Sequence, residues 1–130
     1  MSRINSQQLS VYRQKQRQLI EKLDRVSSRC LFDDSIIRGT PNEVYRKCSK
    51  ANCKCANDLS QRHGPYRVIQ VVRDGKQRQI PLRKDEVELW ELVKRYQFQM
   101  EKYSELKILC FELQELFMAV IEKRLKELPR

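Results

Sequence analysis

Apolar side chains in the first thirty residues recur at alternating intervals of three and four positions. The series consists of Leu9, Tyr12, Gln16, Leu19, Leu23, Val26 and Cys30. Because an α-helix turns once every 3.6 residues, this spacing aligns the series as one mostly apolar stripe. We predict a helix capped by Asn5 or Ser6 that ends near residues 28–30, because turn and breaker residues follow between Asp33 and Pro41.

The helical period disappears in the middle third of the chain, where strand-forming residues take over. Residues 44–47 could form a short strand, and Tyr66 to Val72 is rich in β-branched and aromatic side chains. Asp74-Gly75 then precedes a second run, Gln77 to Leu82, and Asp-Gly strongly favours a tight turn. The pattern predicts an antiparallel β-hairpin.

The last segment, residues 84 to 128, contains no proline or glycine and predicts one very long helix. Two series repeat every seven residues: Leu89, Tyr96, Tyr103, Cys110 and Phe117, and Leu92, Gln99, Leu106, Leu113 and Val120. Such heptads are typical of a coiled-coil seam or a helical bundle. A helix on the order of 65 Å long must cover its apolar face with the N-terminal helix, a second subunit, or both.

A homodimer is the simplest second-subunit arrangement for this seam. We predict its interface to include six residues: Leu92, Tyr96, Tyr103, Leu106, Leu113 and Phe117. The heptads carry tyrosine, cysteine and glutamine in place of the isoleucine and leucine choices that set strand number, so they do not fix the oligomer number. The same helix could instead bind a protein partner.

Three of the five cysteines lie between Cys48 and Cys55, and the only histidine, His63, follows shortly after. Zinc binds four ligands tetrahedrally, and three cysteines with one histidine form an established structural set. We therefore predict a structural Zn²⁺ site formed by Cys48, Cys53, Cys55 and His63. Reduced structural cysteines and an iron–sulfur cluster are the alternatives, and His63 could instead be a turn residue. Cys30 and Cys110, on helical faces, are predicted to be core residues.

These elements together predict a mainly α fold with a small β-hairpin. Residues 1–35 form an N-terminal amphipathic helix, 36–83 a basic zinc knuckle and hairpin, and 84–130 a long coiled-coil-like C-terminal helix. We expect one compact unit with a helical extension.

Positive charge is concentrated in the middle of the chain. The net charge is +10, and residues 41–84 hold eleven basic and three acidic residues, a net charge of +8. A focused positive field attracts polyanions such as nucleic acid. The alternative is a solubilising surface.

The basic side chains surround the predicted knuckle and hairpin. The candidates for nucleic-acid contact are Arg46, Lys47, Lys50, Lys54, Arg62, Arg67, Arg73, Lys76 and Arg78. A two-stranded ribbon can enter the major groove of duplex DNA, where arginine, lysine and glutamine donate hydrogen bonds to phosphates and base edges. Cations on an exposed sheet edge also prevent aggregation, which is the other interpretation.

Catalytic and membrane-protein patterns are absent from the sequence. There is no glycine-rich phosphate loop and no G-x-S-x-G elbow, so we expect no catalytic residues. No apolar run reaches about 18 residues, and the N-terminal region interleaves arginine, lysine and glutamine. These patterns favour a soluble cytoplasmic protein that does not enter membranes.

Several short motifs resemble those of a family of small bacterial and archaeal proteins. The motifs are Arg46 to Cys48, Cys53-Lys54-Cys55-Ala56, His63-Gly64-Pro65-Tyr66 and Asp74-Gly75-Lys76, within a stretch from about residue 36 onward. They resemble the family pattern R-x-C-G-K-x-x-C-x-C, H-G-P-Y and G-K, with Ser49 in place of the glycine. Family members often occur with transposase or other mobile-element genes, so the resemblance implies a mobile-element setting.

Two functions from different classes fit these features. The first is a DNA-binding accessory or regulatory protein that uses the zinc-stabilised hairpin as its contact surface and oligomerises through its helices. The second is a protein–protein adaptor or assembly factor in which zinc is purely structural. Salt separates the two hypotheses, because phosphate contacts weaken steeply with added salt and apolar helix docking does not.

Overall fold

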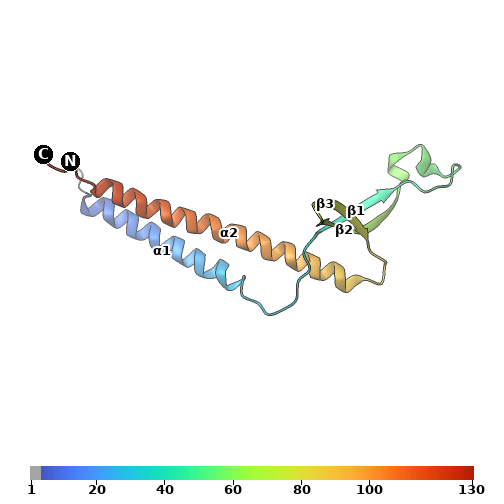
Figure 1. Cartoon of the computed structure of the whole chain (residues 1–130), viewed down its shortest axis with the longest axis horizontal. Helices are drawn as coiled ribbons and strands as arrows, with labels where there is room; N and C mark the ends of the chain where they lie inside the picture. The colour runs from blue at the N-terminus through green and yellow to red at the C-terminus, as the bar shows by residue number, and fades with distance from the viewer. Residues whose placement is uncertain (1–3) are drawn as a thin grey trace. The chain divides into compact units, whose positions relative to one another are not determined.

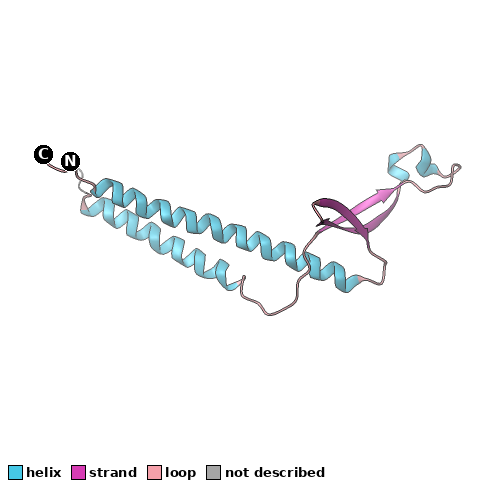
Figure 2. Ribbon diagram, in the orientation of Figure 1, coloured by secondary structure: helices cyan, strands magenta, loops and turns pink. Residues whose placement is uncertain are grey.

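The computed structural model describes residues 4–130, so the first three residues of the predicted N-terminal segment lie outside the described residues. Two helices flank three strands along the chain (Figure 1). The elements are α1 (Ser6–Ser28), β1 (Thr40–Arg46), η1 (Lys54–Ala56), η2 (Leu59–Gln61), β2 (His63–Arg73), β3 (Lys76–Pro81) and α2 (Val87–Arg124). The predicted mainly α class with a central hairpin is confirmed (Figure 2).

The chain divides into two compact units. The helical unit contains the residues up to Asp33 together with Gln99–Arg130, and the sheet unit contains Asp34–Phe98. Helix α2 therefore contributes its first turns to the sheet unit and its remainder to the helical unit. No helix within residues 4–130 has the length and apolar character needed to cross a membrane.

Helix α1 begins at the capping residue that the sequence predicts. The Asn5 side chain accepts a hydrogen bond from the Gln8 backbone N–H at 2.8 Å, and the Gln8 side chain accepts one from the Asn5 N–H at 3.3 Å. This reciprocal capping box satisfies two N–H groups that the first helical turn leaves without partners. The helix ends at Ser28, within the predicted range.

Helices α1 and α2 lie side by side in the helical unit (Figure 1). Leu19 and Leu116 are the most buried residues of the helical unit, and the Gln99 side chain donates a hydrogen bond to the Cys30 carbonyl at 3.1 Å. All seven residues of the predicted α1 stripe are buried or half-buried. The stripe is therefore the face that packs against α2.

The two predicted heptad series of α2 differ in their burial. Gln99, Leu106, Leu113 and Val120, which belong to one series, are half-buried on the side that faces α1. Of the other series within this unit, Tyr103, Cys110 and Phe117 are exposed. One helix can cover only one face of its neighbour, so α1 leaves the second series open.

The sheet unit contains a three-stranded antiparallel sheet with β2 at its centre. The predicted hairpin of β2 and β3 is present, and Asp74 and Gly75 adopt φ of 52° and 75° in its turn. Strand β1 starts at Thr40, four residues before the predicted start at Val44, so it is longer than predicted. It includes Pro41, which an edge strand tolerates because its missing N–H need not join the ladder.

The apolar core of the sheet unit is small. Val68, Ile69, Trp90 and Val93 are buried, and the Ile37 N–H donates to the Leu92 carbonyl at 3.2 Å. Gly39 lies so close to this core that an added Cβ would be 2.6 Å from Ile69 Cγ2. Cys55, also fully buried, lies in the long connection between β1 and β2.

Candidate metal centre

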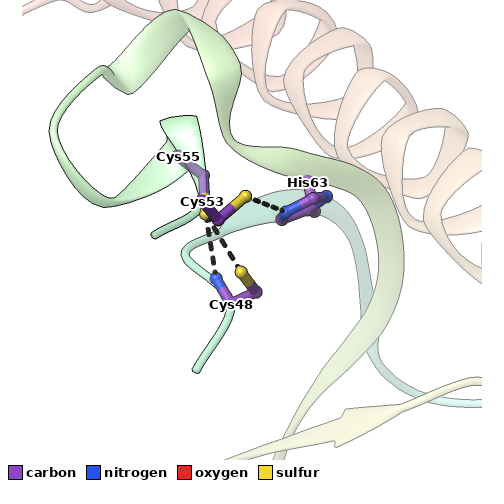
Figure 3. A group of neighbouring side chains, drawn as sticks. All are labelled: Cys48, Cys53, Cys55 and His63. Atoms are coloured by element: carbon purple, nitrogen blue, oxygen red, sulfur yellow. Dashed lines mark hydrogen bonds between the residues drawn. The ribbon is translucent and has the colours of Figure 1, made fainter. Parts of the chain in front are cut away.

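Four potential metal ligands come from both ends of the connection between β1 and β2. Cys48 follows β1, Cys53 precedes η1, Cys55 lies within η1, and His63 is the first residue of β2. Antiparallel pairing places His63 opposite Arg46 at the end of β1, so the two ends of the connection lie close together. The short helices η1 and η2 fold the intervening chain back toward them, as Figure 3 shows.

The four side chains converge on one point. The Sγ atoms of Cys48 and Cys55 are 3.3 Å apart, and Cys53 Sγ lies 3.3 Å from His63 Nε2 (Figure 3). All four ligand atoms lie within 4.8 Å of one another. Tetrahedral zinc with Zn–S bonds of about 2.3 Å separates its sulfur ligands by roughly 3.7 Å. The donor set thus needs only small movements to enclose one metal ion.

The electrostatics of the cluster favour a thiolate at Cys55. The backbone N–H of Cys48 donates to Cys55 Sγ at 3.3 Å and is the main reason that the Cys55 pKa falls to about 6. The Cys48 pKa is raised, chiefly by its side-chain hydrogen bond to Cys55. One thiol therefore ionises before its neighbour, and thiolates are the form that binds metals.

A metal held by these residues would have four protein ligands. Cys48, Cys53, Cys55 and His63 could bind a metal ion, and three sulfurs with one imidazole match the preferences of zinc. A four-ligand site of this kind leaves no position for a reactive water, so its role would be structural.

The other two cysteines lie apart from this group. Cys30 is half-buried at the end of α1, where its thiol donates to the Val26 carbonyl, but Cys110 is exposed on α2. The prediction of a core position is thus wrong for Cys110, because α1 covers a different face of the helix.

Comparison with protein families identifies the region that contains this centre. The sequence matches the family DUF6788, described as a domain of unknown function, over residues 10–95, more than half of the chain. The chain belongs to this family. No curated protein and no solved structure matches the sequence. The DUF6788 match includes most of α1, which the motifs noted in the sequence do not reach, and the mobile-element setting stays a prediction.

In this DUF6788 protein, strand pairing gathers four of the predicted nucleic-acid-binding residues on one face of the sheet. Arg67 and Arg73 alternate with Val68 and Val72 along β2, and residues paired across antiparallel strands share a face. Lys76 pairs with Arg73, and Arg78 pairs with Val71. We call Arg67, Arg73, Lys76 and Arg78 the basic face. Gln70, Gln77 and Gln79 lie on the opposite face, as the predicted alternation requires.

Arg67 differs from the other residues of the basic face because an aromatic ring holds it. Its guanidinium lies over the ring of Trp90, 4.9 Å from the ring centroid. The sequence indicates nothing about this pair, since a single tryptophan on a helix has no spacing relation to a strand residue. The contact positions Arg67 while leaving it exposed to solvent.

The remaining predicted contacts surround the metal centre. Arg46, Lys47 and Arg67 line a pocket of about 250 Å³ together with Cys48, His63, Tyr66, Pro81 and Leu82. Lys50 and Lys54 are exposed on the connection that carries the cysteines. Arg62 is half-buried, and its Nε is a buried donor without a hydrogen-bond partner among residues 4–130.

The structure distributes the predicted oligomer interface over different surroundings. Leu106 and Leu113 are half-buried on the face of α2 that packs against α1. Tyr103 and Phe117 are exposed, whereas Leu92 and Tyr96 are half-buried in the sheet unit. An oligomer remains a prediction, and only the exposed pair is free to contact another molecule.

Proposed function

We propose that this protein is a DNA-binding accessory protein in which a structural zinc ion holds a basic sheet in a fixed shape. The observation that carries the proposal is that one small unit contains both the basic face and a complete set of metal ligands. The metal centre supplies rigidity, the basic face supplies affinity, and no residue is assigned a catalytic role.

Zinc is the metal that best explains the ligand set. Three thiolates and one imidazole satisfy its tetrahedral preference, and the sheet unit buries few apolar residues besides Cys55. Units with so small a core usually need an additional cross-link. A zinc ion at this position would tie β1 to β2 at the end opposite the Asp74-Gly75 turn.

Three residues of the basic face are suited to phosphate contact. Arg73, Lys76 and Arg78 are exposed and share one side of the hairpin. Within residues 4–130 they form no ion pair, so their charges are not neutralised inside the chain. Cations held on a rigid ribbon lose less conformational entropy on binding than cations on a flexible tail.

The pocket beside the metal centre extends the positive surface away from the hairpin turn. Arg46 and Lys47 lie at the end of β1, and Arg67 is held by Trp90. An arginine can bind a phosphate through two parallel hydrogen bonds, so this pocket is suited to one phosphate of a nucleic-acid backbone. A bound strand would then contact both the pocket and the hairpin.

Fluorescence anisotropy with duplex DNA, single-stranded DNA and RNA at several salt concentrations tests this function. We expect the tightest binding to duplex DNA and a steep loss of affinity with salt. Replacing Lys76 and Arg78 with alanine should weaken binding and reduce the slope of log affinity against log salt by about 2. The matched control, Lys123→Ala with Arg124→Ala, removes two exposed cations at the end of α2 and should leave the slope unchanged.

Absence of binding at low salt would contradict the proposal and favour the adaptor hypothesis. An unchanged slope in the folded Lys76, Arg78 variant would exclude the basic face as the contact surface.

A further inference from the structure

The side of α2 that α1 leaves uncovered is strongly apolar. Within the helical unit, its exposed members are Met100, Tyr103, Cys110, Phe111, Phe117, Met118 and Ile121, which we call the open face. Its six large side chains are between 41% and 60% exposed. An exposed apolar patch of this size often marks an interaction surface.

The open face follows the helix as a stripe that two polar residues interrupt. Met100, Tyr103, Cys110, Phe117 and Ile121 recur at helical intervals. Exposed Gln114 occupies one gap, and exposed Lys107, whose Nζ lies 5.1 Å from the Tyr103 ring centroid, occupies the other. Over the 22 residues from Met100 to Ile121 the helix rises about 32 Å. An occupant must therefore be an elongated element with a matching apolar repeat.

Helix α1 extends this surface along one edge. A shallow pocket places Arg13 of α1 beside Phe117 of α2. Ile20 follows Arg13 by seven residues, so it lies on the same edge of α1, and it is 47% exposed. The apolar surface therefore includes both helices of the unit.

The two borders of the open face carry opposite charges. The border formed by α1 is positive beside Phe117, where Arg13 and Arg17 lie one turn apart, although Asp24 follows on the same edge seven residues after Arg17. Glu115 and Glu122 lie four residues after Phe111 and Met118, which places them along the other border. These charged residues are exposed. A partner for this face needs a negative border opposite the arginines and a positive border opposite the glutamates.

We propose that the partner is a second copy of this chain, packed open face against open face. A two-fold axis parallel to the helices would place the Arg13, Arg17 border of each copy against the Glu115, Glu122 border of the other. A perpendicular axis in the interface would instead oppose like charges. The identical apolar stripe on both copies supplies the elongated, repeating surface that the open face requires.

The available area is consistent with a stable dimer. The three aromatic side chains carry roughly 150–250 Å² of surface each, the methionines and isoleucines carry somewhat less, and about half of this surface is exposed on the open face. Seven such side chains, including Ile20, amount to about 600 Å² per copy before the charged borders are added. Stable interfaces bury about 800 Å² per partner. This dimer is independent of DNA binding, which involves the sheet unit.

Sedimentation equilibrium on the full chain tests the interface. We expect a dimer at micromolar concentration, and Phe111→Glu with Met118→Glu should raise its dissociation constant at least thirtyfold, which is about 2 kcal/mol. The control Val11→Glu adds a charge at an equally exposed apolar position on the other edge of α1, near Lys15 and Lys22, and should leave the mass dimeric. Circular dichroism checks that each variant keeps its helices.

Charge reversal then tests the orientation. Arg13→Glu with Arg17→Glu should weaken the dimer, and adding Glu115→Arg with Glu122→Arg in the same chain should restore it. A bismaleimide cross-linker should also join the two copies through Cys110, with no such product from Cys110→Ser.

A monomeric wild type, or a dimer that Phe111→Glu with Met118→Glu leaves intact, would overturn the interface. Failure of the four-residue reversal to restore the dimer would overturn the parallel arrangement.

Discussion

The helical unit and the sheet unit are both too thin to bury much apolar surface, and they differ in what compensates for it. The helical unit buries Leu19 and Leu116 along a seam of half-buried side chains. The sheet unit buries a small group around Val68 and Val93, and its long connection folds around Cys55. One unit therefore depends on side-chain packing between two helices, and the other combines a small core with four potential metal ligands.

This difference shows that the amino-acid composition of each unit determines what can stabilise it. A two-helix unit has a second face that a further helix pair can cover, so association can supply its missing core. In the sheet unit, exposed apolar side chains such as Tyr45, Leu59 and Val72 lie among many basic residues, and positive charge opposes further apolar packing. A metal ion bound by residues from both ends of the connection would compensate for that deficit. Weakening the helix packing should therefore destabilise the helical unit and spare the sheet unit, and removing the metal ion should do the reverse.

The largest effect is expected from Cys55→Ser. This change removes the buried thiolate that accepts the Cys48 N–H, and serine is a poor zinc ligand. We expect loss of bound metal and loss of dispersed amide resonances from the sheet unit, with helical circular dichroism retained. Cys110→Ser is the matched control, because Cys110 is exposed on α2 and should not affect metal content. If the sheet stays folded in metal-free Cys55→Ser protein, the sheet unit does not depend on the metal ion.

A smaller effect is expected from Leu116→Ala in the helical unit. Deleting a buried leucine side chain typically costs 2–5 kcal/mol, and we expect about 2–3 kcal/mol here because the two-helix seam can partly close. Urea unfolding followed by circular dichroism measures the change. Val11→Ala, at an exposed position of α1, should change stability by less than about 0.5 kcal/mol. Metal content should stay unchanged in both variants, and its loss would show that the units are not independent.

The smallest effect is expected from Glu86→Gln, just before α2. The Glu86 carboxylate accepts the Arg83 backbone N–H at 2.9 Å, which is the main cause of its lowered pKa. A lowered pKa means that the ionised form stabilises the fold above the ordinary value of 4.5, and that this contribution disappears as pH falls through the lower folded value. Thermal unfolding should show a slightly less stable variant at neutral pH and near equality in strong acid. If the difference in thermal stability between Glu86→Gln and the wild type stays constant from neutral pH to strong acid, the Glu86 carboxylate does not have this role.

Much of the architecture follows from local sequence signals. The α1 stripe, the Asn5 cap and the Asp74-Gly75 turn are each determined by residues close together in the chain. The clustering of the cysteines with His63 is likewise visible because the ligands lie within sixteen residues of one another.

Features that depend on distant residues could not be predicted in the same way. Strand β1 forms because Thr40 to Val44 find partners in β2, although Pro41 and Asn42 are weak strand formers. The Arg67–Trp90 contact joins a strand to a helix with no shared periodicity. The α2 heptads predict an apolar seam, but which series α1 covers depends on packing that spacing does not determine.

Metal removal from the 130-residue chain tests the central claim most directly. We expect about one zinc per chain by elemental analysis. A strong chelator should then collapse the amide resonances of residues 40–81 in a ¹⁵N-labelled sample, leave those of α1 in place, and abolish duplex DNA binding, with all three reversed by zinc. Metal-free protein with an unchanged sheet spectrum and undiminished DNA affinity would contradict the account.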